Sequence, residues 1–286
     1  MLSIIIVTFN SVRFIKTCLE SVFNQGYKEF ETIIIDNGSS DATVDFIKNN
    51  YPQVLLILNK NNLGPCRARN QGIGIASGEW ILTLDCDVVL ENCFISQIME
   101  FAKDQKDSTA IIQPKILTKD GKIFSCGIRP TWLWRFFDIG RNLDDSDKFN
   151  KCSFVFGACC AAALYRHKSL EGLKDKYGYF DQRFFFLFED ADLSWRSWKK
   201  GWDCRYFPQA KCCHQGNSSS TDSLTRRFLS LRNRVLMILK NQNPVLILLF
   251  SPFYLVYDIP RFIFILIKFK GRFPKLNKYK CQKSVR

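Results

Sequence analysis

Short apolar runs alternate with longer amphipathic segments along the first third of this 286-residue chain. The runs are rich in β-branched residues and too short for helices, which predicts strands buried on both faces, at Ser3–Thr8, Thr32–Ile35, Val54–Leu58 and Ile81–Leu84. After the first strand, apolar residues recur at helical spacing to about Asn24, and Ser11 is placed to cap this helix. A second helix is expected after the second strand, ending at Asn49. This rhythm predicts parallel βαβ units in an α/β fold.

Polar residues stand at the ends of three of these strands, at Thr8, Asp36 and Asp85. In an open α/β sheet the carboxyl ends of parallel strands lie at one edge, where ligands bind. Asp85 and Asp87 are separated by one residue, and residues i and i+2 of an extended chain point to the same side. Two such carboxylates suit Mg²⁺ or Mn²⁺, which also bind substrate phosphates. A solvated acidic turn is the alternative, and these residues alone leave both interpretations open.

The segment that follows the third strand predicts a turn at Gly64-Pro65 and then a helix, since the fixed φ of proline favours the first helical position. Arg67 and Arg69 then lie near free backbone N–H groups, a place that suits a phosphate or a nucleotide base; a solvated helix start is the simpler alternative. The first strand is not followed by G-x-G-x-x-G, and the chain has no Walker A sequence. Both absences argue against a dinucleotide-binding or P-loop protein.

The middle of the chain predicts fewer regular elements. We expect a helix near Asn92–Lys103, a strand pair at Ala110–Leu117 and Lys122–Cys126, and a single strand at Ser153–Tyr165. Gly127–Lys151 is irregular, aromatic and mixed in charge, so we expect a mobile loop there.

A buried aromatic run, Phe184–Phe188, leads directly into Glu189-Asp190-Ala191-Asp192, where we expect a helix to begin. The helix macrodipole favours acids at this end, and a cap explains one of them. Three acids in four positions exceed what a cap requires. His214 ends a predicted strand at Ala210–Cys213; a lone histidine is usually structural, but one at a strand end can be a ligand.

With 47% hydrophobic and 24% charged residues, the composition is that of a globular protein. Its twelve cysteines form no C-x-x-C pairs, and the adjacent pairs at 159–160 and 212–213 fit neither a zinc site nor a disulfide framework. Met1 leads straight into a strand, so we expect no signal peptide, reduced thiols and a cytoplasmic protein. The net charge of +14 is concentrated between Asp222 and Arg286, where 14 Lys and Arg face two acids, and it suits nucleic acid or an anionic membrane.

Taken in order, these motifs resemble the family-two glycosyltransferases of the GT-A fold, especially the rhamnosyltransferase-like branch that builds bacterial cell-surface polysaccharides. The resemblance covers roughly Ser3 to Asn233 and rests on IIIVTFNS, IIIDNGSSD, NNLGPCRARNQG, LDCDV, GYFDQRFFFLFEDADLSWR and His214. It implies a Rossmann-like, mostly parallel sheet flanked by helices in residues 1–225, with a nucleotide-sugar half at about 1–105 and an acceptor half at about 106–225. A basic and apolar helical extension, 226–286, follows and is expected to associate with a membrane.

The resemblance also assigns roles by position. Five residues match contacts to the nucleotide part of the donor: Thr8, Asn10, Asp36, Arg69 and Asp85. Asp85 and Asp87 match the motif that binds the metal and the diphosphate, with His214 as a further ligand of Mg²⁺ or Mn²⁺. Cys86 departs from the family pattern, because many relatives carry Pro or Ala there.

On the acceptor side, the resemblance matches Asp190 to the catalytic base, with Glu189 and Asp192 beside it, and Asp181 to a position near the acceptor. The implied reaction moves a sugar from a UDP- or dTDP-sugar to a hydroxyl of a glycan acceptor, in one displacement with inversion. A lipid-linked acceptor and a place at the cytoplasmic face of the membrane are expected, and nucleic acid is not.

Two other classes of protein share part of this pattern. A sugar-phosphate nucleotidyltransferase would share the fold but needs a Gly-rich phosphate loop, which Phe9-Asn10-Ser11 is not. A basic nucleic-acid-binding or membrane-binding module without catalysis would explain the charge but not the carboxylate motifs.

The segment Pro244–Phe269 is about as long as a membrane span, but Pro252, Asp258, Pro260 and Arg261 interrupt it. We therefore expect segments that lie in the membrane interface, with the basic tail Lys268–Arg286 on anionic headgroups. A helical pair packed against the catalytic domain and a re-entrant hairpin are the alternatives.

Overall fold

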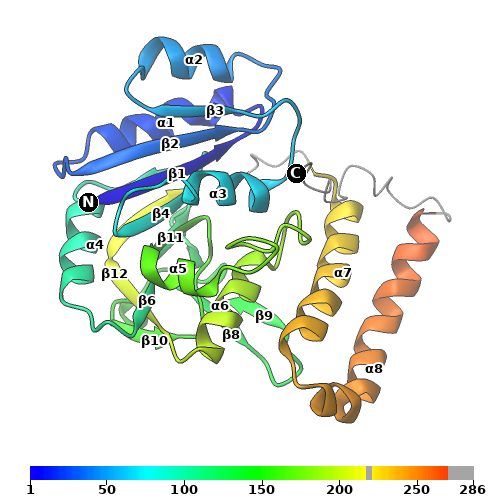
Figure 1. Cartoon of the computed structure of the whole chain (residues 1–286). Coiled ribbons are helices and arrows are strands. Elements are labelled where there is room, and N and C mark those ends of the chain that lie inside the picture. The colour runs from blue at the N-terminus through cyan, green and yellow to red at the C-terminus, as the bar shows by residue number, and fades with distance from the viewer. Residues whose placement is uncertain (217–220, 270–286) are drawn as a thin grey trace.

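The computed structural model describes residues 1–216 and 221–269. A ten-stranded sheet runs through the centre with helices on both faces, and two long helices, α7 (Ser223–Asn241) and α8 (Pro244–Phe269), stand beside it (Figure 1). The basic tail lies outside the described residues from position 270 onward.

The N-terminal half of the sheet is parallel, as the apolar runs predict. Its strands are β1 (Leu2–Thr8), β2 (Phe30–Asp36), β3 (Leu55–Leu58) and β4 (Trp80–Asp85), in the order β4-β1-β2-β3. Alternate residues of β1 pack on opposite faces: Ile4 and Ile6 against α1 (Val12–Phe23), and Ile5 on the face of α3 (Pro65–Ile73). A short helix, α2 (Thr43–Asn50), joins β2 to β3. The carboxyl ends of β1, β2 and β4 therefore meet at one edge.

The C-terminal half adds mixed strands beyond β4. The strand β11 (Ala162–Arg166) lies between β4 and β6 (Thr109–Thr118) and is antiparallel to both, and β12 (Asp203–His214) runs parallel to β6. The remaining edge strands are β5 (Val88–Leu90), β7 (Ile123–Ser125) and β10 (Ser153–Val155). Three helices cover this half: α4 (Phe94–Lys103), α5 (His167–Leu173) and α6 (Glu189–Lys199). These elements confirm the predicted α/β fold with a mostly parallel sheet.

Three local predictions are corrected. Ser153–Tyr165 contains two strands that pair with different partners: β10 pairs with β12, and β11 pairs with β4 and β6. Gly157 between them lies so close to α6 that an added Cβ would come within 2.1 Å of the hydroxyl of Ser194. Ser11 precedes α1, but its hydroxyl donates to the carbonyl of Phe9 instead of capping the helix.

The third correction concerns Gly127–Lys151, which is structured rather than a mobile loop. It forms a hairpin of β8 (Ile128–Pro130) and β9 (Phe136–Asp138), and a 3₁₀ turn, η1 (Asp147–Phe149). Trp134, between the two strands, stacks on Trp195 of α6 with ring centroids 3.6 Å apart. This long-range stacking, which no local pattern announces, fixes the segment.

The helix α8 continues through Pro252 and Pro260, where the sequence led us to expect interruptions. Each proline removes one backbone donor, and α8 nevertheless runs through both positions while it packs along α7. By length and composition α8 is the one described helix apolar enough to cross a membrane, and 6% of its most apolar 18-residue window is buried. The structure pairs α8 with α7 and leaves most of α8 exposed, so the expectation of a membrane-interface segment stays a prediction.

Candidate active site

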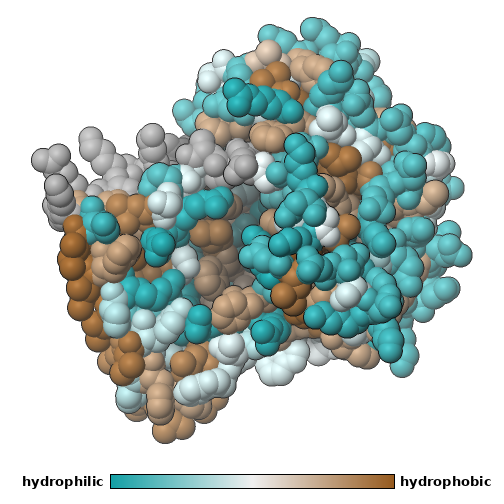
Figure 2. Space-filling view, turned by 180° about the vertical axis from the view of Figure 1, so that it is seen from behind, coloured by the Kyte–Doolittle hydropathy of each residue, from teal (hydrophilic) through white to brown (hydrophobic). Residues whose placement is uncertain are grey.

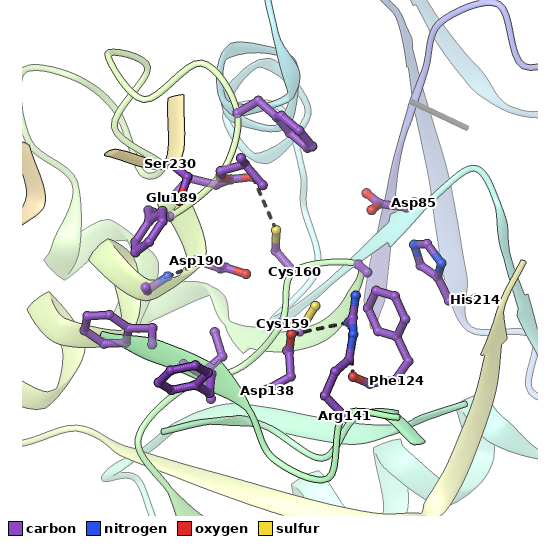
Figure 3. A pocket seen from close by; sticks show the side chains of 18 of the residues that line it. Asp85, Phe124, Asp138, Arg141, Cys159, Cys160, Glu189, Asp190, His214 and Ser230 are labelled. Carbon is purple, nitrogen blue, oxygen red and sulfur yellow. Dashed lines mark hydrogen bonds and ion pairs between the residues drawn. The ribbon is translucent and has the colours of Figure 1, made fainter. Parts of the chain in front are cut away.

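A cavity of about 500 Å³ opens at the carboxyl edge of the sheet, between the β4–β5 turn and the start of α6 (Figure 3). Its walls come from segments far apart in sequence: the β4–β5 turn, the β8–β9 hairpin, the loop at 159–161, the residues before α6, the end of β12, and α7. The residues on these walls that carry chemistry are Arg69, Asp85, Asp87, Asp138, Arg141, Glu189, Asp190, His214 and Arg226.

Asp85, Asp87 and His214 form a cluster on one wall. Asp85 ends β4, and His214 ends β12, which pairs with β5 directly after Asp87. One ligand atom from each residue lies within 4.8 Å of the other two. Asp87 is 1% exposed, and its Oδ1 lies 3.6 Å from Nε2 of His214. The structure therefore brings together three residues that the sequence only placed at separate strand ends.

The ring of His214 is held by an aromatic partner that sequence reasoning missed. Phe124 stacks on it, with centroids 4.2 Å apart and planes at 16°. Arg141 lies over Phe124 at 3.8 Å and contacts Asp138 at 3.3 Å. Phe124 lies in β7, Asp138 ends β9, and Arg141 follows β9. No motif in the sequence marks these three residues.

Arg69 connects the two sides of the cavity. Its guanidinium is buried, and it contacts Oδ1 of Asp85 at 2.7 Å and Oε1 of Glu189 at 3.0 Å. Burial alone would lower the pKa of Arg69, but the surrounding anionic groups hold it well above its usual value. Arg69 therefore remains charged, and it fixes the carboxylate of Glu189.

Asp190 lies in the first turn of α6, on the opposite wall from the cluster, and Figure 3 shows its carboxylate directed into the cavity. One oxygen accepts the backbone N–H of Ala191 at 2.8 Å. Burial, together with the nearby charges of Glu189 and Asp138, raises the pKa of Asp190 to about 8. A carboxylate with such a pKa is a much better proton acceptor than an exposed one.

Asp181 and Asp192 are placed away from the cavity. Both are fully buried, and Nζ of Lys240 on α7 lies 2.8 Å from Asp181 and 2.9 Å from Asp192. Asp192 also accepts from Arg196 and Asn241. Burial alone would raise the pKa of Asp181, but hydrogen bonds from Arg183 and Lys240 lower it. Lys240 therefore ties both acids to α7. Asp192 points away from Asp190 because residues two apart on a helix point to nearly opposite sides.

A smaller hollow of about 140 Å³ adjoins the cavity and shares Arg69 and Asp85 with it. Thr8 lines this hollow, and its buried hydroxyl has no hydrogen-bond partner among the described residues. Asn37 lines it too, although sequence reasoning did not select it.

Asp36 and Asn10 do not line the hollow; they shape the loop beside it. Asp36 accepts the backbone N–H groups of Gly38 and Ser39 at 3.0 and 2.8 Å, and Asn10 accepts that of Ser40 at 2.8 Å. Their contacts fix the backbone that follows β2.

Known proteins resemble this chain in sequence. Residues 3–173 match the family described as Glycosyl transferase family 2. The chain is 31% identical over 133 residues to the Putative glycosyltransferase EpsH of Bacillus subtilis (strain 168), across 46% of this chain and 38% of that protein. It is 28% identical over 218 residues to the Poly-beta-1,6-N-acetyl-D-glucosamine synthase of Staphylococcus epidermidis, across 74% of this chain and 49% of that protein. The matches thus span less than half of these relatives.

Two solved structures share the fold. GalNAc-T7 with UDP, GalNAc and Mn²⁺ gives a TM-score of 0.64 at 16% identity, over 83% of this chain and 47% of that chain. S. aureus TarS 1-349 in complex with UDP-GlcNAc gives 0.55 at 18% identity, over 85% and 67%. Likeness at this identity concerns the fold and agrees with the expected GT-A type. Because the family match covers more than half of the sequence, the chain belongs to glycosyl transferase family 2.

Proposed function

We propose that this protein transfers a sugar from a nucleoside-diphosphate sugar to a hydroxyl group of a glycan acceptor. The observation that carries the proposal is one cavity with the Asp85–Asp87–His214 cluster on one wall and Asp190 on the other. The smaller hollow beside Thr8 suits the nucleoside part of the donor, because it joins the cavity at Asp85. The sugar then lies between the cluster and Asp190.

The cluster fits a divalent cation. Two carboxylates and an imidazole converge, and Nδ1 of His214 has no hydrogen-bond partner among the described residues. Carboxylate ligands suit Mg²⁺ and Mn²⁺, and the crystal structure of GalNAc-T7 contains Mn²⁺. Bound there, the cation would neutralise the charge that grows on the departing nucleoside diphosphate.

Asp190 is the proposed base. It takes the proton from the acceptor hydroxyl while that oxygen bonds to the anomeric carbon and the bond to the diphosphate breaks. Arg69 holds Glu189 by an ion pair, so Asp190 is the carboxylate of the pair that can accept the proton. A base on the acceptor side, with no second carboxylate assigned as a nucleophile, supports a single displacement with inversion.

For the donor, UDP-N-acetylglucosamine is the first candidate, because one relative is a poly-beta-1,6-N-acetyl-D-glucosamine synthase and TarS, which shares the fold, is found in complex with UDP-GlcNAc. The acceptor is proposed to be a lipid-linked glycan used in bacterial cell-surface polysaccharide synthesis, met at the cytoplasmic face of the membrane. The basic residues of α7 and the apolar length of α8 support a membrane location.

A donor-hydrolysis screen without acceptor tests this function. Nucleotide sugars of UDP and dTDP are incubated with the full chain and Mn²⁺ or Mg²⁺, and release of the nucleoside diphosphate is measured. We expect release from at least one UDP-sugar, its loss in EDTA, and its loss in a folded Asp87→Ala variant. Full turnover in EDTA would contradict the metal assignment, and no release from any donor would contradict the function.

A further inference from the structure

Two neighbouring arginines of α7 face two different spaces. Arg226 lines the catalytic cavity, whereas Arg227 lines a separate cleft of about 270 Å³ between α7 and α8. The other residues of this cleft are Pro260, Arg261, Phe264 and Ile265. The α7–α8 cleft thus combines two guanidinium groups with an otherwise apolar lining.

The α7–α8 cleft carries a surplus of positive charge. Arg227 lies 5.3 Å from the ring centroid of Phe264, and no carboxylate of the described residues pairs with it. Arg261 lies 3.3 Å from Asp258, but that single carboxylate also pairs with Arg234. The single negative charge of Asp258 is thus shared by Arg234 and Arg261, and Arg227 adds a further positive charge. This surplus of positive charge suits the cleft to an anion.

The side of α8 that points away from α7 is uncharged. Tyr254, Asp258, Arg261 and Ile265 recur at spacings of four, three and four, which puts them on one stripe. Tyr254 and Ile265 are buried, and Asp258 and Arg261 pair within the helical pair. The exposed residues are large and apolar: Val245, Leu248, Leu249, Leu255, Val256, Ile259, Phe262, Ile263 and Ile267. In Figure 2 they contribute to the brown margin of the molecule.

The α7–α8 cleft and the catalytic cavity share a wall. Ser230 lines the cavity, and its hydroxyl accepts a hydrogen bond from Arg261 of the cleft at 3.2 Å. Arg226, one turn earlier on α7, also lines the cavity. A ligand anchored in the cleft therefore has the catalytic cavity directly across one helix.

We propose that the α7–α8 cleft binds the phosphate group of a lipid-linked acceptor, and this rests on the proposed function. Arg227 and Arg261 hold the phosphate oxygens, because guanidinium groups bind phosphate through paired N–H donors. The lipid chain follows the apolar face of α8 into the bilayer, and the glycan end reaches the cavity near Asp190. Charge complementarity to the two arginines and the uncharged face beside them single out an anionic lipid as occupant.

Vesicle binding of the full chain tests the site without measuring catalysis. One set of phosphatidylcholine vesicles contains a long-chain isoprenyl phosphate, and the other carries the same surface charge from phosphatidylglycerol. We expect the wild type to bind the isoprenyl phosphate vesicles about tenfold more tightly, as hydrogen bonds to charged groups allow. Equal affinity for both would mean attraction to any anionic headgroup and would overturn the proposal.

Substitutions of single arginines show which residues cause the preference for isoprenyl phosphate vesicles. Arg227→Gln and Arg261→Gln should each remove most of the preference, and Arg227→Lys should keep part of it, since lysine retains the charge but not the paired donors. Arg205→Gln is the matched control: Arg205 also lies over a phenylalanine ring, at 4.1 Å from Phe154, but on β12 and away from the cleft. A preference that survives in both glutamine variants would refute the site, as would its loss in Arg205→Gln alone.

Two further measurements separate the sources of failure. Inorganic phosphate at the lipid's concentration should not displace the protein from the isoprenyl phosphate vesicles; complete displacement would show a free-phosphate site instead. Donor hydrolysis by the wild type is assayed independently. If donor hydrolysis is absent while the vesicle preference holds, the proposed function is wrong and the phosphate site stands. If hydrolysis is present while the vesicle preference is absent, only the phosphate site is wrong.

Discussion

At the scale of residues, the neighbours Glu189 and Asp190 differ in their contacts with cations. Arg69 contacts Glu189 at 3.0 Å, whereas Asp190 forms no ion pair with the described residues; it accepts a backbone N–H at 2.8 Å and lies near the negative charges of Glu189 and Asp138. The same low-dielectric wall therefore keeps Glu189 in an ion pair and raises the pKa of Asp190. In the proposed mechanism the two adjacent acids therefore have different roles: Glu189 is held in an ion pair and Asp190 accepts the proton.

Replacing Asp190 by Asn keeps the shape and removes the proton acceptor. We expect turnover to fall by about 10²-fold or more while donor affinity changes little. Donor binding by calorimetry and transfer rates with a glycan acceptor check this. Asp192→Asn is the comparison: its loss of contacts with Arg196 and Lys240 should lower thermal stability before it lowers turnover. Near-normal turnover in Asp190→Asn would move the base to another residue.

The pKa of Asp190 also couples to folding. It is about 8 in the folded state against 3.8 for an unperturbed Asp, so between these pH values the folded state binds more protons than the unfolded state. Stability contributed by this group is therefore present at about pH 4 and lost as the pH rises toward 8. We expect Asp190→Asn to melt at a higher temperature than the wild type at pH 8, and at the same temperature near pH 4. A variant less stable at pH 8 would contradict the raised pKa.

At the scale of elements, α7 supports the loop that precedes α6 through the side chain of Asn233. Nδ2 of the buried Asn233 lies 2.9, 2.8 and 2.8 Å from the carbonyls of Phe184, Phe186 and Leu187. These belong to the loop that leads into α6, where Phe185, Leu187 and Phe188 all have φ between 63° and 71°. Left-handed conformations cost roughly 1–3 kcal/mol per residue, so the loop needs such external support.

Asn233→Leu removes these donors at similar volume. We expect a loss of about 1–3 kcal/mol of stability from unsatisfied carbonyls. Turnover should fall more than donor affinity, because the loop positions Glu189 and Asp190. Chemical denaturation and steady-state kinetics measure the two effects, and Asn92→Leu, at an exposed position, is the control. An unchanged turnover number would show that the loop holds its shape without the hydrogen bonds of Asn233.

The elements also show what the sequence can and cannot reveal. Strands buried on both faces leave apolar runs, so β1, β2 and β4 and their polar ends were predictable. The β8–β9 hairpin was not, because the stacking of Trp134 on Trp195 joins positions 61 residues apart. It carries Asp138 and leads to Arg141, which line the cavity. The separation of Asp190 from Asp192, in contrast, follows from helical spacing of 100° per residue.

At the scale of the whole molecule, the outer face of α8 is the proposed membrane contact. Leu248 and Val256 are each 76% exposed, so charging them leaves the packing on α7 intact. We expect the wild type to sediment with anionic vesicles and to be released in part by salt, and Leu248→Glu/Val256→Glu to stay in the supernatant. The control is Leu55→Glu/Leu58→Glu, at half-exposed positions of the edge strand β3. Equal partitioning of all three proteins would leave α8 without a role at membranes.

The proposed membrane contact of α8 has a consequence for the concentration of acceptor that the enzyme meets. With α8 on a bilayer, enzyme and lipid-linked acceptor share a two-dimensional compartment, so their encounters depend on molecules per unit area rather than per litre. Diluting a vesicle suspension with buffer should then leave the transfer rate per enzyme unchanged. Diluting the acceptor with neutral lipid inside each bilayer should lower it. The supply of acceptor in one membrane, and not the size of the cell, would set the pace of synthesis.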